Sequence, residues 1–202
     1  RELVFGKGSE VIESGRIATA QTRGGTGALR VVNDFLNSNL PGSTLWMTSP
    51  TWPNHPNIFE AAGVSIESFP YFDPATNQLD FAAMIAAIEK IPAGDAILLH
   101  GCCHNPTGVD PTTDQWQQIA DLVYDRGLLP ILDFAYQGFA DGIEEDAAGL
   151  RAFLWPGKEL FVCSSFSKNF GLYRERVGAL SAIASSAEAA GAVQSQLNRV
   201  IR

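Results

Sequence analysis

The chain has 202 residues, of which 46% are hydrophobic and 18% are charged, a composition that excludes a disordered protein. Its 14 Lys and Arg against 22 Asp and Glu give a net charge of −8, which argues against nucleic acid or an anionic membrane as a partner. No apolar run approaches the roughly 20 residues of a membrane span, and the first residues lack the apolar core of a signal peptide. Three cysteines cannot form a disulfide framework, so we expect a cytoplasmic, globular protein.

Helical and strand-like patterns alternate along the sequence. In chain order they are a helix through 28–36, strands at 43–48 and 64–69, a helix through 81–88, a strand at 96–100, a helix through 116–123, and strands at 128–133, 160–164 and 177–184. Asp80 is placed to cap the second helix, and Thr112 or Thr113 the third. This order predicts an α/β fold with a mainly parallel sheet and helices on both faces, whose ligand site lies beyond the carboxyl ends of the strands.

Three successive strand candidates end in polar residues. Asp133 closes the strand at 128–133, Asn105 follows the strand at 96–100, and Lys168 follows the strand at 160–164. Taken singly, Asp133 could cap a helix, Asn105 could start a turn before Pro106, and Lys168 could be a solvated surface residue. Their shared location at one edge of the sheet favours a site instead.

The environment of Lys168 favours covalent chemistry with a carbonyl group. Its neighbours are small, hydroxylic or apolar, so we expect a partly desolvated amine with a lowered pKa, the form that attacks a carbonyl carbon. Asp133 is placed to pair with the ring nitrogen of a pyridine-type cofactor. Backbone N–H groups of Gly24–Gly27 at a helix start, with Ser165, Ser167 and Arg176, could bind a phosphate despite the negative net charge.

Several longer motifs carry a family resemblance. They are Ser-Ser-Phe-Ser-Lys-Asn-Phe-Gly-Leu-Tyr-Arg-Glu-Arg-Val-Gly (164–178), His-Asn-Pro-Thr-Gly (104–108), Asp-Phe-Ala-Tyr-Gln-Gly-Phe (133–139), Gly-Gly-Thr-Gly-Ala-Leu-Arg (24–30) and Ser-Pro-Thr-Trp-Pro-Asn-His (49–55). The sequence resembles the class I pyridoxal-phosphate-dependent aminotransferases, most closely the aspartate and aromatic aminotransferase subgroup. The resemblance implies the large domain of fold type I, and it extends along essentially the whole chain.

The resemblance also implies a role for each site residue. Lys168 forms the internal aldimine with pyridoxal 5'-phosphate and moves the proton between Cα and C4′, and Asp133 pairs with the pyridine nitrogen. Asn105 and Tyr136 bond the phenolic oxygen and lower the aldimine pKa. The remaining expected contacts are Gly25, Thr26, Ser165, Ser167 and Arg176 to the phosphate, Trp52 stacked on the ring, and His55 orienting Asp133. Simpler interpretations stay open for Trp52 as core packing, His55 as a helix-start residue and Ser167 as a turn hydroxyl.

By the same resemblance, residues 1–202 are the cofactor-binding large domain of a homodimer, without the family's N-terminal segment and C-terminal small domain. The implied substrates are an amino acid and a 2-oxo acid, with 2-oxoglutarate as acceptor. The motif Trp-Pro-Asn-His at 52–55 favours aspartate over aromatic substrates. The peptides before Pro50 and Pro106 are expected to be cis.

Three alternatives bear on this interpretation. One is a non-catalytic fragment or a cofactor-binding module without transamination, and residues 1–202 alone are expected to show no turnover. A nucleotide-binding oxidoreductase is disfavoured because no strand is predicted to lead into Gly24. A metal site at His100, Cys102, Cys103 and His104 is disfavoured because adjacent cysteines in an extended segment should point to opposite faces, so we expect no metal.

Overall fold

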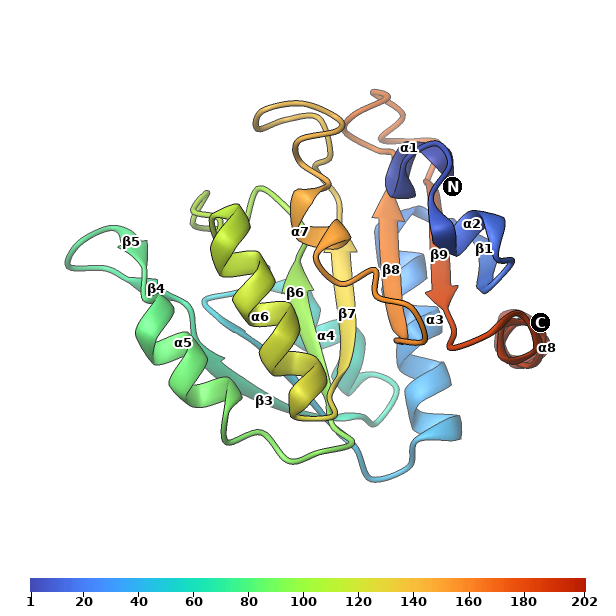
Figure 1. The fold of residues 1–202 in the computed structure, drawn as a ribbon, viewed down its shortest axis with the longest axis horizontal. Helices are drawn as coiled ribbons and strands as arrows, with labels where there is room; N and C mark the ends of the chain where they lie inside the picture. Colours follow the sequence, from blue (N-terminus) through green and yellow to red (C-terminus); the bar gives the residue numbers. More distant parts are fainter.

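A seven-stranded sheet, in the strand order β1-β9-β8-β7-β6-β2-β3, runs through the centre of the computed structural model, which describes residues 1–202 (Figure 1). The strands are β1 (Ile17–Arg23), β2 (Thr44–Ser49), β3 (Ser65–Pro70), β6 (Ala96–His100), β7 (Leu129–Phe134), β8 (Leu160–Ser165) and β9 (Val177–Ile183), and β4 (Phe72–Asp73) pairs with β5 (Gln78–Leu79) in a separate hairpin. Neighbouring strands from β3 to β8 pair in parallel. β9 pairs antiparallel with both of its neighbours, β8 and β1. The α/β architecture and the mainly parallel sheet are therefore as predicted.

Helices cover both faces of this sheet. One face packs against α1 (Glu2–Phe5), α2 (Glu10–Glu13), α5 (Phe81–Ile88), α6 (Thr113–Asp125) and α7 (Ala148–Arg151). The other packs against α3 (Gly24–Asn39), α4 (Asn54–Glu60) and α8 (Ala187–Ile201). In Figure 1, α5, α6 and α7 lie in front of the strands and α3 and α4 behind them. None of these helices combines the length and apolarity required to cross a bilayer.

Local sequence explains where the central elements begin. Every residue of β6 and β8 is buried, which matches the continuous apolar runs of strands covered on both faces. Thr112 starts α6 with a reciprocal capping box, in which its hydroxyl and the Gln115 side chain each bond the other residue's backbone N–H. Asp80 caps α5 by accepting from the N–H of Ala83. The Ser49–Pro50 and Asn105–Pro106 peptides are cis, as expected.

One expectation about the fold is wrong. β1 leads directly into α3 at Gly24, although no strand was predicted there. The sequence Ile-Ala-Thr-Ala-Gln-Thr-Arg has little apolar character because β1 is an edge strand with several half-buried or exposed positions. β1 pairs only with β9 and in antiparallel fashion, so it does not form the parallel βαβ unit of a dinucleotide-binding fold.

Candidate functional site

A cavity of about 510 Å³ opens at the carboxyl ends of β6, β7 and β8, a size within the usual range for small-molecule sites. It is lined by Gly25, Thr26, Leu29, Trp52, His100, Cys102, Asn105, Asp133, Ala135, Tyr136, Ser165, Ser167, Lys168, Tyr173, Arg174 and Arg176. All predicted site residues except His55 belong to this set. Parallel pairing explains the convergence, because β6, β7 and β8 all end at the same edge of the sheet.

Asp133 is the buried acid of the cavity, with 8% of its surface exposed. It occupies the end of β7, opposite His100 of β6 and Cys163 of β8 in the sheet register. Its Oδ2 lies 2.9 Å from Nε2 of the fully buried His55, on α4. His55 therefore lies behind Asp133 and fixes the orientation of the carboxylate towards the cavity.

A chain of hydrogen bonds connects this pair to Asn105. The backbone N–H of Asn105 donates to Nδ1 of His100 at 3.2 Å, and His100 Nε2 lies 3.2 Å from the hydroxyl of Thr51. Burial lowers the pKa of His100 well below its ordinary value, so its ring is neutral and carries its proton on Nε2. The Thr51 hydroxyl then donates to His55 Nδ1 at 2.8 Å, which leaves His55 Nε2 as the donor to Asp133.

Lys168 contributes a free amine to the cavity. The residue is half-buried in the loop after β8, and its Nζ lies 4.3 Å from the ring centroid of Tyr136 and 5.8 Å from that of Tyr173. No protein hydrogen bond engages Nζ, and the same is true of the side-chain amide of Asn105. Both groups are therefore available to a ligand in the cavity.

Another set of lining residues is suited to a phosphate. Gly25 and Thr26 line the cavity and belong to the first turn of the 16-residue helix α3, whose backbone N–H groups have no partner within the helix. A Cβ at Gly25 would lie 3.0 Å from the Cβ of Ser165, so a side chain there would fill the space in front of the helix terminus. Arg176 donates to the hydroxyl of Ser167 at 3.3 Å, which adds a cation and a hydroxyl to the donors.

Trp52 lines the cavity and meets His55 edge to face, with ring centroids 5.2 Å apart. Sequence reasoning missed four other residues: Thr51 and His100 of the hydrogen-bond chain, and Tyr173 and Arg174 of the cavity wall. Thr51 lies inside the motif at 49–55, and His100 ends a predicted strand, so both positions could have been examined for a polar role. No local pattern distinguishes Tyr173 or Arg174.

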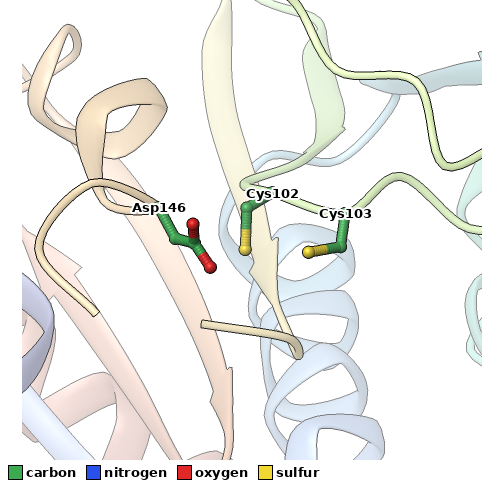
Figure 2. A group of neighbouring side chains, drawn as sticks. All are labelled: Cys102, Cys103 and Asp146. Atoms are coloured by element: carbon green, nitrogen blue, oxygen red, sulfur yellow. The ribbon is translucent and has the colours of Figure 1, made fainter. Parts of the chain in front are cut away.

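The expectation that the two adjacent cysteines point to opposite faces is wrong. Cys103 has a φ of +50°, so the segment is not extended, and both thiols face the same region (Figure 2). The two sulfur atoms and a carboxylate oxygen of Asp146 lie within 4.8 Å of one another. Asp146, however, accepts hydrogen bonds from four backbone N–H groups, which occupy the roughly four lone-pair positions of a carboxylate. Its oxygens therefore hold a loop and have no lone pair to offer an ion.

The sequence and the structure were compared with known proteins. The family model for aminotransferase class I and II matches residues 2–202. An aspartate aminotransferase from Salmonella typhi is 54% identical over 202 residues, which are 100% of this chain and 51% of that protein.

Two solved structures extend the likeness to the fold. An aromatic amino acid aminotransferase from Burkholderia cenocepacia superposes with a TM-score of 0.98 at 49% identity, covering 100% of this chain and 50% of the other. An aromatic-amino-acid aminotransferase from Burkholderia pseudomallei, covalently bound to pyridoxal phosphate, gives 0.97 at 48% identity with the same coverage. The chain thus spans about half the length of the proteins it matches.

Proposed function

The chain belongs to the class I and II aminotransferases, a family of pyridoxal-phosphate-dependent enzymes, and on this premise we propose that it serves transamination between an amino acid and 2-oxoglutarate through a Schiff base on Lys168. The observation that carries the proposal is the convergence of Asp133, Asn105 and Lys168, from three successive strand ends, on one cavity. Residues 1–202 would then be the cofactor-binding part, and the activity is proposed for the full-length protein.

The donor set of the cavity fits pyridoxal phosphate. The start of α3, Ser165, Ser167 and Arg176 would hold the phosphate, because backbone N–H groups, hydroxyls and a guanidinium together suit a dianion. Asp133 is a carboxylate bonded to Nε2 of His55, and a carboxylate suits a protonated ring nitrogen. The ring would lie against Trp52.

When bound, the cofactor supplies an aldehyde that takes up amino groups and a ring that withdraws electrons. The chain's own groups then position and move protons. Asn105 and Tyr136 would donate hydrogen bonds to the phenolic oxygen of the ring. The Lys168 amine, half-buried and free of protein partners, would take the proton from the substrate Cα and deliver it to C4′, the aldehyde carbon of the cofactor, on the other side of the amino nitrogen.

We propose aspartate as the preferred amino acid, on the support of the motif at 52–55 and the similarity to an aspartate aminotransferase. We also propose a homodimer in the cytoplasm. The proposal of a dimer is supported by large apolar side chains exposed on the two loops beside the cavity, namely Phe139, Ile143, Phe170, Leu172 and Tyr173.

The test is to incubate the protein with pyridoxal phosphate, reduce it with borohydride and map the labelled residue. Label is expected on Lys168. Lys158 serves as an internal control, because its Nζ also lies over an aromatic ring, 5.1 Å from the Tyr124 centroid, but away from the cavity. Equal labelling of both lysines, or none on Lys168, would refute the Schiff-base proposal. A label on Lys168 in a full-length protein that fails to transaminate aspartate or phenylalanine would support a cofactor-binding module instead.

A further inference from the structure

Asn105 and Tyr136 lie on two irregular loops, residues 101–110 after β6 and residues 135–146 after β7. Neither loop has a helix or strand ladder to bond its backbone, so its N–H groups need other partners. Two carboxylates outside the cavity wall provide them, and one thiol connects the loops.

Asp146 organises the loop that follows Tyr136. Its carboxylate, on a residue 6% exposed, accepts from the N–H groups of Gly138 at 2.8 Å, Ala140 at 3.1 Å, Asp141 at 2.9 Å and Gly142 at 3.3 Å. Burial alone would raise the pKa of Asp146, but the backbone donors outweigh it and keep the pKa below its ordinary value. An acceptor that is charged at neutral pH therefore holds four backbone N–H groups of this loop.

Asp110 does the same for the loop that carries Asn105. Its two carboxylate oxygens accept from the N–H groups of Cys103 and, at 2.8 Å, of His104, the two residues directly before Asn105. Cys103 has the left-handed φ of +50°, which side-chain-bearing residues adopt only when the surroundings hold them there. The carboxylate of Asp110 provides that restraint.

Cys103 connects the two loops. Its backbone N–H bonds to Asp110, and its Sγ donates to the carbonyl oxygen of Tyr136 at 3.9 Å, a weak thiol hydrogen bond. Figure 2 shows its side chain directed beside Cys102, with Asp146 on the far side. Burial raises the pKa of the Cys103 thiol, and the negative charges of Asp110 and Asp146 raise it further, so the thiol keeps its proton and stays a donor.

We propose that Asp110, Asp146 and Cys103 are positioning residues that hold Asn105 and Tyr136 together for one shared acceptor. The inference rests on the proposed function, in which that acceptor is the phenolic oxygen of pyridoxal phosphate. The two carboxylates set the backbone of each loop, and Cys103 sets the spacing between the loops.

The first measurement needs no cofactor. Amide hydrogen exchange is compared between the wild-type protein and Asp146→Asn, with Asp141→Asn as the matched control, because Asp141 lies on the same loop but its side chain is exposed and bonds nothing. In Asp146→Asn, exchange is expected to rise about tenfold in residues 136–142 and also, through Cys103, in residues 102–105. Wild-type exchange in both segments would overturn the inference.

The second measurement uses the protein loaded with pyridoxal phosphate and titrates the visible absorbance of the bound cofactor against pH. Looser donors to the phenolic oxygen should raise the midpoint by about one pH unit, a tenfold change in the protonation equilibrium, in Asp146→Asn and Cys103→Ala. Cys103→Ser should shift the midpoint less than Cys103→Ala, because a hydroxyl can donate to the same carbonyl once the side chain moves towards it. Asp141→Asn should not move it.

The outcomes separate the two proposals. If the wild-type protein is not labelled at Lys168, the proposed function fails, and with it the positioning role. If the wild-type protein is labelled and exchange rises in the variants while the absorbance midpoint stays unchanged, the three residues only stabilise their loops and the positioning role is refuted alone. Should Asp146→Asn fail to fold, the contrast between Cys103→Ala and Cys103→Ser decides.

Discussion

Buried polar side chains occur at both ends of the central sheet, but the two ends differ in how completely these side chains are hydrogen-bonded within the chain. At the end where β1 begins, Arg16 is 3% exposed and all of its donor nitrogens are bonded. Its guanidinium donates to both carboxylate oxygens of Glu10 and to the carbonyl oxygens of Trp155, Lys158 and Ala184. This cluster ties the first helices to the sheet and leaves no donor for a ligand.

At the carboxyl end, only part of the polar set is satisfied within the chain. Asp133 is bonded directly to His55, and Thr51 links His55 to His100. The Lys168 amine and the Asn105 amide, by contrast, line the cavity without a protein partner. Both groups are half-buried, and they line a cavity whose size is in the usual range for small-molecule sites. The cluster around Arg16 is therefore structural, whereas the polar groups at the carboxyl end include two that can bond a ligand.

The largest effect that this comparison predicts is at Lys168. Lys168→Ala should abolish the borohydride-fixed label, since no other amine faces the cavity beside Tyr136. In the full-length protein it should also lower transamination by at least about 10²- to 10⁴-fold, the contribution of proton transfer alone. Peptide mapping and a coupled assay measure the two losses. Lys158→Ala is the matched control and should change neither. A labelled Lys168→Ala protein would show that another group carries the chemistry.

A stability loss of about 2–4 kcal/mol is expected from Arg16→Leu, because the carbonyl oxygens it bonds would be left without a donor. Urea denaturation measures this loss. Under native conditions Lys168 should still be labelled, since Arg16 lies at the other end of the sheet. Arg30→Leu breaks only an exposed ion pair with Asp34, so it should cost less than about 1 kcal/mol. Equal losses for the two variants would mean that the buried Arg16 cluster stabilises the protein no more than an exposed ion pair does.

The sequence was sufficient for features that depend on near neighbours. The strand at 96–100 is fully buried and has the predicted bounds, and Thr112 caps α6 through a residue three positions away. The placement of Asp133, Asn105 and Lys168 at strand ends followed from the same patterns, because parallel strands share an edge.

Features that depend on distant partners could not be read from the sequence. β1 is stabilised by β9, about 160 residues later in the chain, and Arg16 bonds carbonyl groups as far away as Ala184. The orientation of Cys103 follows from its left-handed φ, which Asp110 holds by a backbone hydrogen bond. In each case the deciding contact lies outside the window in which a local pattern can be recognised.

The smallest predicted effect concerns the neutral histidines behind the cavity. His104 bonds Thr48 at 3.0 Å and Thr107 at 2.8 Å and stacks on Tyr71, so it is satisfied without a charge. Burial lowers its pKa to about 4. An unfolded histidine binds its proton near pH 6.5, so between pH 6.5 and 4 the unfolded state holds more protons than the folded state. Stability should therefore be constant above pH 6.5 with respect to this group and fall below it.

The expected slope is about 1.4 kcal/mol per pH unit for each such histidine. His100, whose pKa is also lowered by burial, adds to the slope of the wild-type protein. His104→Asn cannot take up a proton, so its loss of stability between pH 7.5 and 5.5 should be smaller than that of the wild type by about 1.4 kcal/mol. Urea denaturation at the two pH values gives this difference. Parallel curves would mean that His104 takes up its proton as readily in the folded protein as in the unfolded one, and that its buried position does not lower its pKa.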